Sequence, residues 1–195
     1  MCSPSCIAFA SSSLSPDEIR GKRVIEVGSF DVNGSIRPWA ESFGPASYTG
    51  VDIVAGPGVD QICDANRLVD RLGPQSFDLV ISTEMLEHVR DWRRVVSNLK
   101  NLVAPGGSLL VTTRSAGFGY HGFPCDFWRF SVDDFNTIFH DMAVADVARI
   151  PTARASSSRR GGRWDSSSSR SKTSRSTPSS SPAAATTSAT LKHGC

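Results

Sequence analysis

Cysteine is sparse in this 195-residue chain, and the five cysteines are scattered at Cys2, Cys6, Cys63, Cys125 and Cys195. An odd number without regular spacing argues against a disulfide framework. Cys2 and Cys6 form a close pair, but no third cysteine or histidine follows them at the spacing of a metal or iron–sulfur site. We therefore expect neither disulfide bonds nor a metal ion.

Long hydrophobic runs are also lacking. No apolar stretch approaches the roughly 20 residues that a membrane-spanning helix needs. The N-terminus has no basic segment of the kind that opens a secretion signal, and the apolar stretch Cys6–Ala10 is too short for one. These absences favour a cytoplasmic protein that does not associate with membranes.

A strong excess of one charge sign is missing as well, because the formal net charge is only +2. The charge is unevenly distributed, however. From Pro151 onward six arginines, two lysines and one aspartate give about +7, which leaves about −5 for the first 150 residues. A mildly acidic body does not favour nucleic-acid binding.

Strand and helix patterns alternate between Gly21 and Ile150, which predicts βαβ units in one sheet. The expected fold class is α/β, with a Rossmann-like, doubly wound and mostly parallel sheet. Residues 1–20 are expected to be a loose N-terminal arm, 21–150 the folded domain, and 151–195 a disordered Ser/Arg-rich tail of low complexity. The predicted strands cover residues 23–27, 47–53, 59–63, 77–82, 108–113 and 142–150, and the clearest helical period runs from 89 to 103.

The stretch Arg23–Arg37 contains a β-branched strand, a glycine turn at Gly28 and the start of a helical pattern near Ser35. A strand followed by such a turn and a helix forms a cradle of nucleotide size at the carboxyl edge of a sheet. The glycines do not match the G-x-G-x-x-G spacing of dinucleotide-binding proteins, because Phe30 and Asn33 stand where that spacing needs glycine.

Four motifs in order, V-I-E-V-G-S-F-D-V-N-G, Y-T-G-V-D-I, F-D-L-V-I-S-T-E-M-L-E-H-V and L-V-A-P-G-G-S-L-L-V-T-T, resemble those of class I S-adenosylmethionine-dependent methyltransferases. The resemblance is to the small-molecule branch called methyltransferase type 11, and it covers about Gly21–Ile150. It implies an enzyme that binds S-adenosylmethionine, releases S-adenosylhomocysteine and methylates a small-molecule acceptor. The glycine loop departs from the family pattern, because its second glycine, Gly34, comes six residues after Gly28.

The resemblance also implies roles for individual residues. Glu26 would lie near the methionine amino group, Asp52 would bind both ribose hydroxyls, and Asp64 would meet the adenine amino group. The cofactor-binding residues implied by position are Glu26, Gly28, Ser29, Gly34, Asp52, Ile53, Asp64, Ala65, Thr83, Glu84 and Met85. Asp64 has an ordinary alternative as a helix cap, and Glu87 is expected to be a first-turn helix acid.

The segment Arg114–Phe130 is punctuated by glycine and rich in aromatic residues, and it is expected to act both as a lid over the sheet edge and as packing for the last helix. Tyr120, His121 and Arg129 are the candidate substrate residues, although Arg129 has Asp126 and Asp133 as alternative partners. His88 and His121 are the candidate catalytic bases, which only an acceptor that loses a proton requires. Part of this segment resembles stretches of family members linked to sugar and glycan pathways, which implies a sugar or glycan precursor as the acceptor.

The chain beyond Ile150 shows no hydrophobic period. Methyltransferases of this class close the sheet with a hairpin of their last two strands, so the sheet is expected to lack its last edge strand, and a frame-shifted end would explain this. Two alternatives to the enzyme follow: a cofactor-binding protein without catalysis, and an RNA-associated protein that uses the basic tail.

Overall fold

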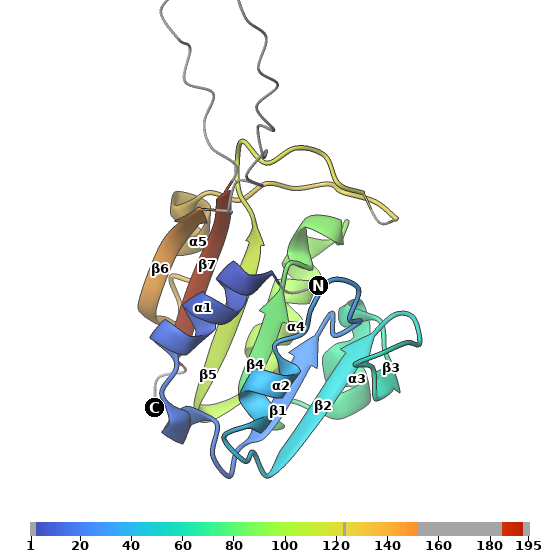
Figure 1. Ribbon diagram of the computed structural model, residues 1–195, viewed down its shortest axis with the longest axis vertical. Coiled ribbons are helices and arrows are strands. Elements are labelled where there is room, and N and C mark those ends of the chain that lie inside the picture. The colour runs from blue at the N-terminus through green and yellow to red at the C-terminus, as the bar shows by residue number, and fades with distance from the viewer. Residues whose placement is uncertain (1–2, 123, 152–184, 193–195) are drawn as a thin grey trace, which may run out of the picture.

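The computed structural model describes residues 3–122, 124–151 and 185–192 (Figure 1). Its strands form one seven-stranded mixed sheet in the order β3-β2-β1-β4-β5-β7-β6. The strands are β1 (Arg23–Val27), β2 (Ser47–Asp52), β3 (Gln61–Ile62), β4 (Phe77–Thr83), β5 (Val103–Arg114), β6 (Ala143–Pro151) and β7 (Ala185–Lys192). The α-helices are α1 (Pro4–Ser13), α2 (Arg37–Glu41), α3 (Leu68–Leu72), α4 (Trp92–Leu102) and α5 (Val132–Ile138), and three 3₁₀ helices are η1 (Pro16–Glu18), η2 (Ala65–Arg67) and η3 (Leu86–His88). The predicted α/β class with a mostly parallel sheet is confirmed.

Helices cover both faces of the sheet, so two separate hydrophobic clusters form (Figure 1). On one face Phe9 of α1 and Ile36, the residue that precedes α2, pack with Leu79 and Leu110 of the central strands. On the other face α3, α4 and α5 bury Leu68, Leu99 and Phe135, among others. The sheet is therefore the middle of three layers, and only its carboxyl edge is left for a binding site.

Strands β1, β2 and β4 are parallel neighbours, with β1 in the centre. Val24, Ile25 and Val27 of β1 are at most 2% exposed, as expected for β-branched residues of a strand covered on both faces. Because the three strands run in the same direction, Val27, Asp52 and Thr83 end at the same edge of the sheet. The sequence predicted these strands to within about one residue.

Helix α4 buries Val95, Val96, Leu99 and Leu102 along one side, which confirms the predicted helical period. It begins at Trp92, where the side chain of Asp91 accepts a hydrogen bond from the Arg94 amide. His88, one of the two candidate bases, lies before this helix in the separate turn η3.

The expectation of a loose N-terminal arm is wrong. Pro4–Ser13 form α1, and Cys6, Phe9, Ala10 and Leu14 are at most 6% exposed. The Ser13 hydroxyl donates a hydrogen bond to Asp146 of β6. The sequence analysis missed this short helix because the segment is rich in serine, although its few apolar residues pack against the sheet.

The expectation of a missing strand is also wrong. Residues Ala185–Lys192 form β7, which pairs antiparallel with β5 and with β6. It is an interior strand, since β6 forms the edge, and Ala189, Thr190 and Leu191 are fully buried. The hypothesis of a frame-shifted end rested on the missing strand and therefore loses its support. The rest of the predicted tail, 152–184 and 193–195, lies outside the described residues.

Among the described residues, Cys6, Cys63 and Cys125 are free thiols. No helix among residues 3–122, 124–151 and 185–192 has the length and apolar character to span a bilayer.

Candidate functional site

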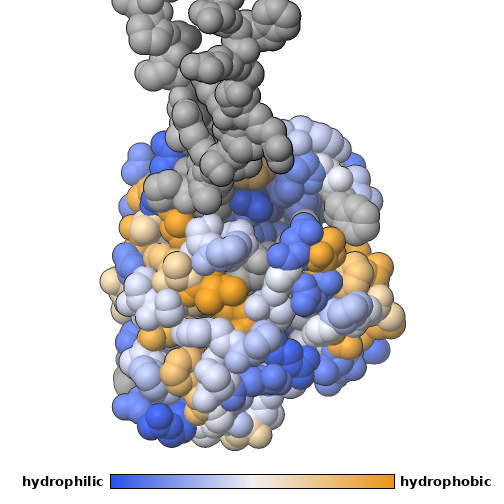
Figure 2. All heavy atoms as spheres, in the orientation of Figure 1, coloured by the Kyte–Doolittle hydropathy of each residue, from blue (hydrophilic) through white to orange (hydrophobic). Residues whose placement is uncertain are grey.

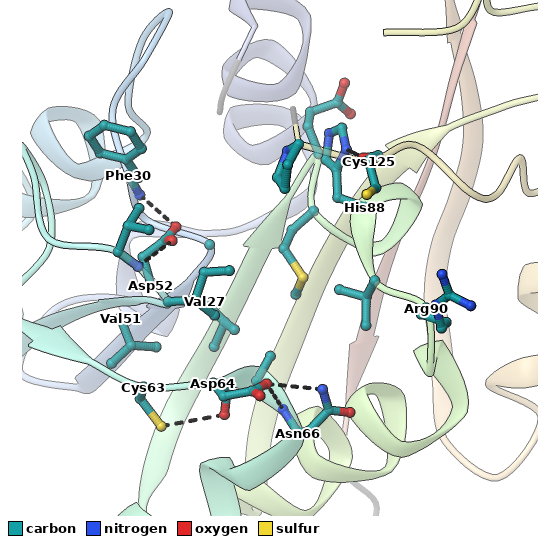
Figure 3. Close-up of a pocket in the computed structure, with 18 of the residues that line it drawn as sticks. Val27, Phe30, Val51, Asp52, Cys63, Asp64, Asn66, His88, Arg90 and Cys125 are labelled. Carbon is teal, nitrogen blue, oxygen red and sulfur yellow. Dashed lines mark hydrogen bonds between the residues drawn. The ribbon is translucent and has the colours of Figure 1, made fainter. Parts of the chain in front are cut away.

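A cavity of about 380 Å³ opens at the carboxyl ends of β1, β2 and β4. In Figure 3, Asp52 and Asp64 lie on one side of this cavity, and His88 and Cys125 lie across from them. Figure 2 shows hydrophobic surface on the β2–β3 side of the molecule, where Ile53, Val54 and Ile62 are exposed. The lining residues are Val27, Gly28, Phe30, Val32, Val51, Asp52, Ile53, Val54, Cys63, Asp64, Ala65, Asn66, Glu84, Met85, His88, Val89, Arg90, Pro124, Cys125 and Phe127.

The glycine turn after β1 keeps the floor of this cavity open. Gly28 has a φ of +83°, and a Cβ at this position would lie 2.8 Å from Cγ of Met85. The amides of Gly28 and Ser29 both donate to the carbonyl of Val51, at 2.9 and 3.1 Å. A larger residue would therefore be strained and would push Met85 into the space that a ligand needs.

The lengthened loop that follows is held by its own side chains. Asp31 Oδ1 accepts a hydrogen bond of 2.8 Å from the Gly34 amide, and the Asp31 amide donates to the Pro57 carbonyl. The Phe30 ring covers Gly56 so closely that a Cβ there would lie 2.1 Å from the ring. Gly34 therefore forms part of the turn within the loop and does not line the cavity, whereas Phe30 does.

Asp52 ends β2 with its carboxylate at the cavity. Oδ2 accepts from the Phe30 amide at 3.2 Å, and Oδ1 accepts from the Val54 amide at 3.3 Å. Both hydrogen bonds are long, and a carboxylate has about four acceptor sites, so Asp52 can also accept two neighbouring hydroxyls. Asp64 lines the same side and caps η2 by accepting from the Asn66 amide at 2.8 Å, so the helix-cap reading holds for it.

Glu26 is 2% exposed and does not belong to the cavity lining. Its Oε2 accepts a hydrogen bond of 2.8 Å from the Tyr48 hydroxyl. Burial raises the pKa of Glu26 to about 7, although the Tyr48 hydrogen bond opposes this. A cationic partner would stabilise the ionised form of Glu26. The resemblance implied such a partner, the methionine amino group of the cofactor.

Two further acids, Glu84 and Glu87, are buried where β4 ends and η3 begins. Glu84 has a positive φ of 53°, and its Oε2 lies 2.6 Å from Nε of Arg114. Burial raises the pKa of Glu84, and Arg114 opposes that shift. Glu87 lies in the first turn of η3, as expected, but it is fully buried and accepts a hydrogen bond of 2.8 Å from the Thr113 hydroxyl.

The aromatic segment performs both of its expected structural roles. Pro124, Cys125 and Phe127 line the cavity, whereas Phe130 is buried between Trp92 and Phe135. Among the predicted substrate residues, none belongs to the lining: Tyr120 is 76% exposed, and Arg129 is paired with Asp126. The Arg129 guanidinium holds the pKa of Asp126 well below its ordinary value.

Seven of the predicted cofactor residues line the cavity, namely Gly28, Asp52, Ile53, Asp64, Ala65, Glu84 and Met85. Glu26, Ser29, Gly34 and Thr83 do not. Of the two predicted catalytic histidines, His88 lines the cavity and His121 lies beside His88, with the ring centroids 5.0 Å apart. The sequence did not single out Asn66, Val89 or Arg90, which carry no local pattern that marks a site.

Comparison with curated proteins finds similarity over part of the chain. A ubiquinone biosynthesis O-methyltransferase from Idiomarina loihiensis is 31% identical over 110 residues, which cover 50% of this chain and 44% of that protein. The protein of the same name from Chromobacterium violaceum is 32% identical over 108 residues, covering 49% and 45%. The chain thus spans less than half the length of these relatives.

Solved structures share the fold over nearly the whole chain. An S-adenosylmethionine-dependent methyltransferase from Mesorhizobium loti has a TM-score of 0.64 at 17% identity, with 95% of this chain and 96% of that chain covered. The 1,6-didemethyltoxoflavin-N1-methyltransferase from Burkholderia thailandensis, solved with 1,6-didemethyltoxoflavin and S-adenosylhomocysteine, has a TM-score of 0.65 at 14% identity, with 97% and 79% covered.

A family model described as a methyltransferase domain matches residues 7–175, which is most of the chain. The strand order with an antiparallel β7, the glycine turn under a cavity and the acid at the end of β2 agree with that match. The chain therefore belongs to the class I S-adenosylmethionine-dependent methyltransferase family.

Proposed function

We propose that this protein transfers the methyl group of S-adenosylmethionine to a small-molecule acceptor. The observation that carries the proposal is the cavity, which has Gly28 and Asp52 on one side and Cys125 and Phe127 of the aromatic segment on the other. The first side suits an adenosyl group, and the second leaves room for a separate molecule. A single cavity bordered by both groups of residues would bring a methyl donor and an acceptor next to each other, as a group transfer needs.

Within the cavity we assign the ribose hydroxyls to Asp52 and the adenine side to Asp64, Ala65 and Asn66. Glu26, which is buried outside the cavity lining, would reach the methionine ammonium through water, and its carboxylate with a raised pKa would be stabilised by that cation. Gly28 would allow the backbone to approach the ligand closely. The bound cofactor would supply an electrophilic methyl carbon on a positively charged sulfur.

The acceptor is proposed to offer an oxygen atom, because the curated relatives are named as O-methyltransferases. The oxygen lone pair would form the new bond to the methyl carbon while the carbon–sulfur bond breaks and its electron pair passes to sulfur. A hydroxyl acceptor also loses its proton, and the group that promotes this loss must lie on the His88 side of the cavity. A sugar or glycan precursor is the first acceptor class to test.

The alternative of a binding protein without catalysis rested on an incomplete sheet. Since β7 completes the sheet, that reason is gone. The RNA-associated alternative rested on the basic tail, most of which lies outside the described residues.

Calorimetric titration with S-adenosylhomocysteine tests the proposal. Asp52→Ala is expected to weaken binding by about 1–3 kcal/mol, because two ribose hydroxyls lose their charged partner. Asp70→Ala is the matched control, since this acid lies on α3 with a side chain 61% exposed and does not line the cavity. Equal affinity in both variants would remove Asp52 from the site, and the absence of binding by the unaltered protein would overturn the proposal.

A further inference from the structure

Three side chains that can bind metal ions converge beside the cavity. One ligand atom from each of Glu87, His88 and His121 lies within 4.8 Å of the other two. The Glu87 oxygen is 3.9 Å from the His88 nitrogen and 3.8 Å from the His121 nitrogen. These separations are too long for hydrogen bonds between the three groups.

Each of these atoms is buried, and none has a hydrogen-bond partner among the described residues. Glu87 is the clearest case, because its side chain is completely buried while Oε1 accepts no hydrogen bond from the described residues and has Arg114 Nε no nearer than 3.8 Å. An unpaired buried carboxylate oxygen carries a large desolvation cost. Three orphaned ligand atoms that face one another indicate a common partner for all three.

The remaining atoms of the three side chains are anchored. Glu87 Oε2 accepts from the Thr113 hydroxyl at 2.8 Å. His88 Nδ1 lies 2.6 Å from the Cys125 carbonyl, and His121 Nδ1 lies 3.3 Å from Asp126 Oδ2. A carbonyl or carboxylate on Nδ1 is the usual outer support of a metal-binding histidine, because it fixes the tautomer and leaves Nε2 as the ligand.

The local charges also favour a cation. The two arginines near the cluster already face other acids, since Arg114 lies against Glu84 and Arg129 against Asp126. Arg114 Nε is 3.8 Å from Glu87 Oε1, so it contributes some positive charge here, but its shorter contact is with Glu84.

We propose that Glu87, His88 and His121 bind one divalent transition-metal ion at the rim of the cavity. Two imidazoles and one carboxylate suit Zn²⁺, and also Mn²⁺, Fe²⁺ or Co²⁺, better than Mg²⁺ or Ca²⁺. Bonds of about 2.0–2.2 Å require only a small inward shift of the two rings from the present separations. Three protein ligands leave at least one coordination position open, and His88 connects the site to the cavity.

The open position would bind the oxygen of the methyl acceptor. This consequence rests on the proposed function, whereas the metal site itself does not. A bound metal ion lowers the pKa of a hydroxyl that coordinates it, so the acceptor would lose its proton to solvent before it attacks the methyl carbon. His88 and His121 would then act as ligands and not as general bases.

The test is metal uptake by the full chain after treatment with a chelator and dialysis. We expect one Zn²⁺ or Co²⁺ per chain, with the visible absorption of bound Co²⁺ reporting nitrogen and oxygen ligands. His121→Ala and Glu87→Gln should each weaken metal affinity by at least about 100-fold. Removing a residue that only orients a ligand lowers metal affinity by up to about 100-fold, and removing the ligand itself should lower it at least as much. Glu87→Gln has nearly the same shape and keeps an acceptor for Thr113, so it separates ligand loss from misfolding.

His140→Ala is the matched control. His140 is exposed on the same half of the chain, and its Nδ1 lies 2.9 Å from the Thr137 carbonyl. Absence of uptake by the unaltered chain, or equal losses in His140→Ala and His121→Ala, would overturn the metal site. Titration of the metal-free chain with S-adenosylhomocysteine tests cofactor binding separately, so a failure of the proposed function is distinguishable from a failure of the metal site.

Discussion

The two halves of the sheet differ in the sequence separation between the strands that pair with each other. In the cofactor half, formed by β3, β2, β1 and β4, parallel neighbours all come from residues 23–83. In the closing half, formed by β5, β7 and β6, Val111 pairs with Ala189 and Ile150 pairs with Thr186. The cofactor half could therefore be inferred from local patterns, whereas the closing half depends on partners that no local pattern connects.

The halves also differ in what their polar groups do. The cofactor half places Asp52 and Asp64 at the cavity, with each carboxylate also stabilising a backbone turn or cap. Beside the closing half, Arg114 at the end of β5 lies 2.6 Å from Glu84 and 3.8 Å from Glu87, so one cation faces two buried acids. One half is suited to hold a ligand by hydrogen bonds, and the other is suited to position charge close to the reaction.

The largest expected effect tests whether β7 is as firmly packed as the central strands. Leu191→Ala in β7 and Leu79→Ala in β4 should each lower the free energy of unfolding by about 2–5 kcal/mol, because both side chains are fully buried. Urea denaturation followed by circular dichroism measures both, with Val144→Ala, at a residue 41% exposed, as the control. A negligible cost for Leu191→Ala would mean that β7 does not contribute to the core.

The next effect concerns pH and the buried acid of the cofactor half. The pKa of Glu26 rises from an ordinary 4.5 to about 7 on folding, so its stabilising contribution is fully present below pH 4.5 and is lost as pH rises through about 7. Glu26→Gln, which keeps an acceptor for Tyr48, should therefore gain up to about 3 kcal/mol over the unaltered chain between pH 4.5 and pH 8. Denaturation at a series of pH values measures the difference, and parallel pH curves for the two proteins would contradict it.

A smaller effect separates backbone strain from steric overlap in the glycine turn. Gly28→Ala and Gly21→Ala both place a side chain at positive φ, and each should cost about 1–3 kcal/mol of stability. Only the Cβ at position 28 meets Met85, while position 21 has nothing within 4 Å. We expect S-adenosylhomocysteine affinity to fall in Gly28→Ala alone, and equal affinities would show that the turn does not form the cavity floor.

The smallest effect lies at an ion pair between β7 and the N-terminal part of the chain. Lys192 Nζ is 3.1 Å from Glu18 Oε1, which also accepts a hydrogen bond of 2.9 Å from Ser108. A double-mutant cycle of Glu18→Gln and Lys192→Met should give about 0.2–1 kcal/mol, as for other partly exposed pairs. A coupling energy of zero at low salt would indicate that β7 does not end beside η1.

Much of the cofactor half could be predicted because its physics is local. A β-branched run predicted β1 and a continuous apolar run predicted β4, while the family resemblance placed Asp52, the last residue of β2, at the binding edge of the sheet. The turn at Gly28 was predicted too, but its reason, the approach of Met85, requires that β1 and β4 be neighbours. The unusual loop length was visible in the sequence, whereas the packing of Phe30 on Gly56 was not.

The sequence by itself determined the α/β class, the positions of the first strands along the chain and the residues of the glycine turn. It could do so because a strand, a turn and an amphipathic helix are set by neighbours a few residues apart. Only the tertiary structure decided that a Thr/Ala-rich stretch becomes the interior strand β7, and that Glu87, His88 and His121 meet. Both outcomes depend on burial against segments far away in the chain, and a short polar sequence does not specify such contacts before the sheet is assembled.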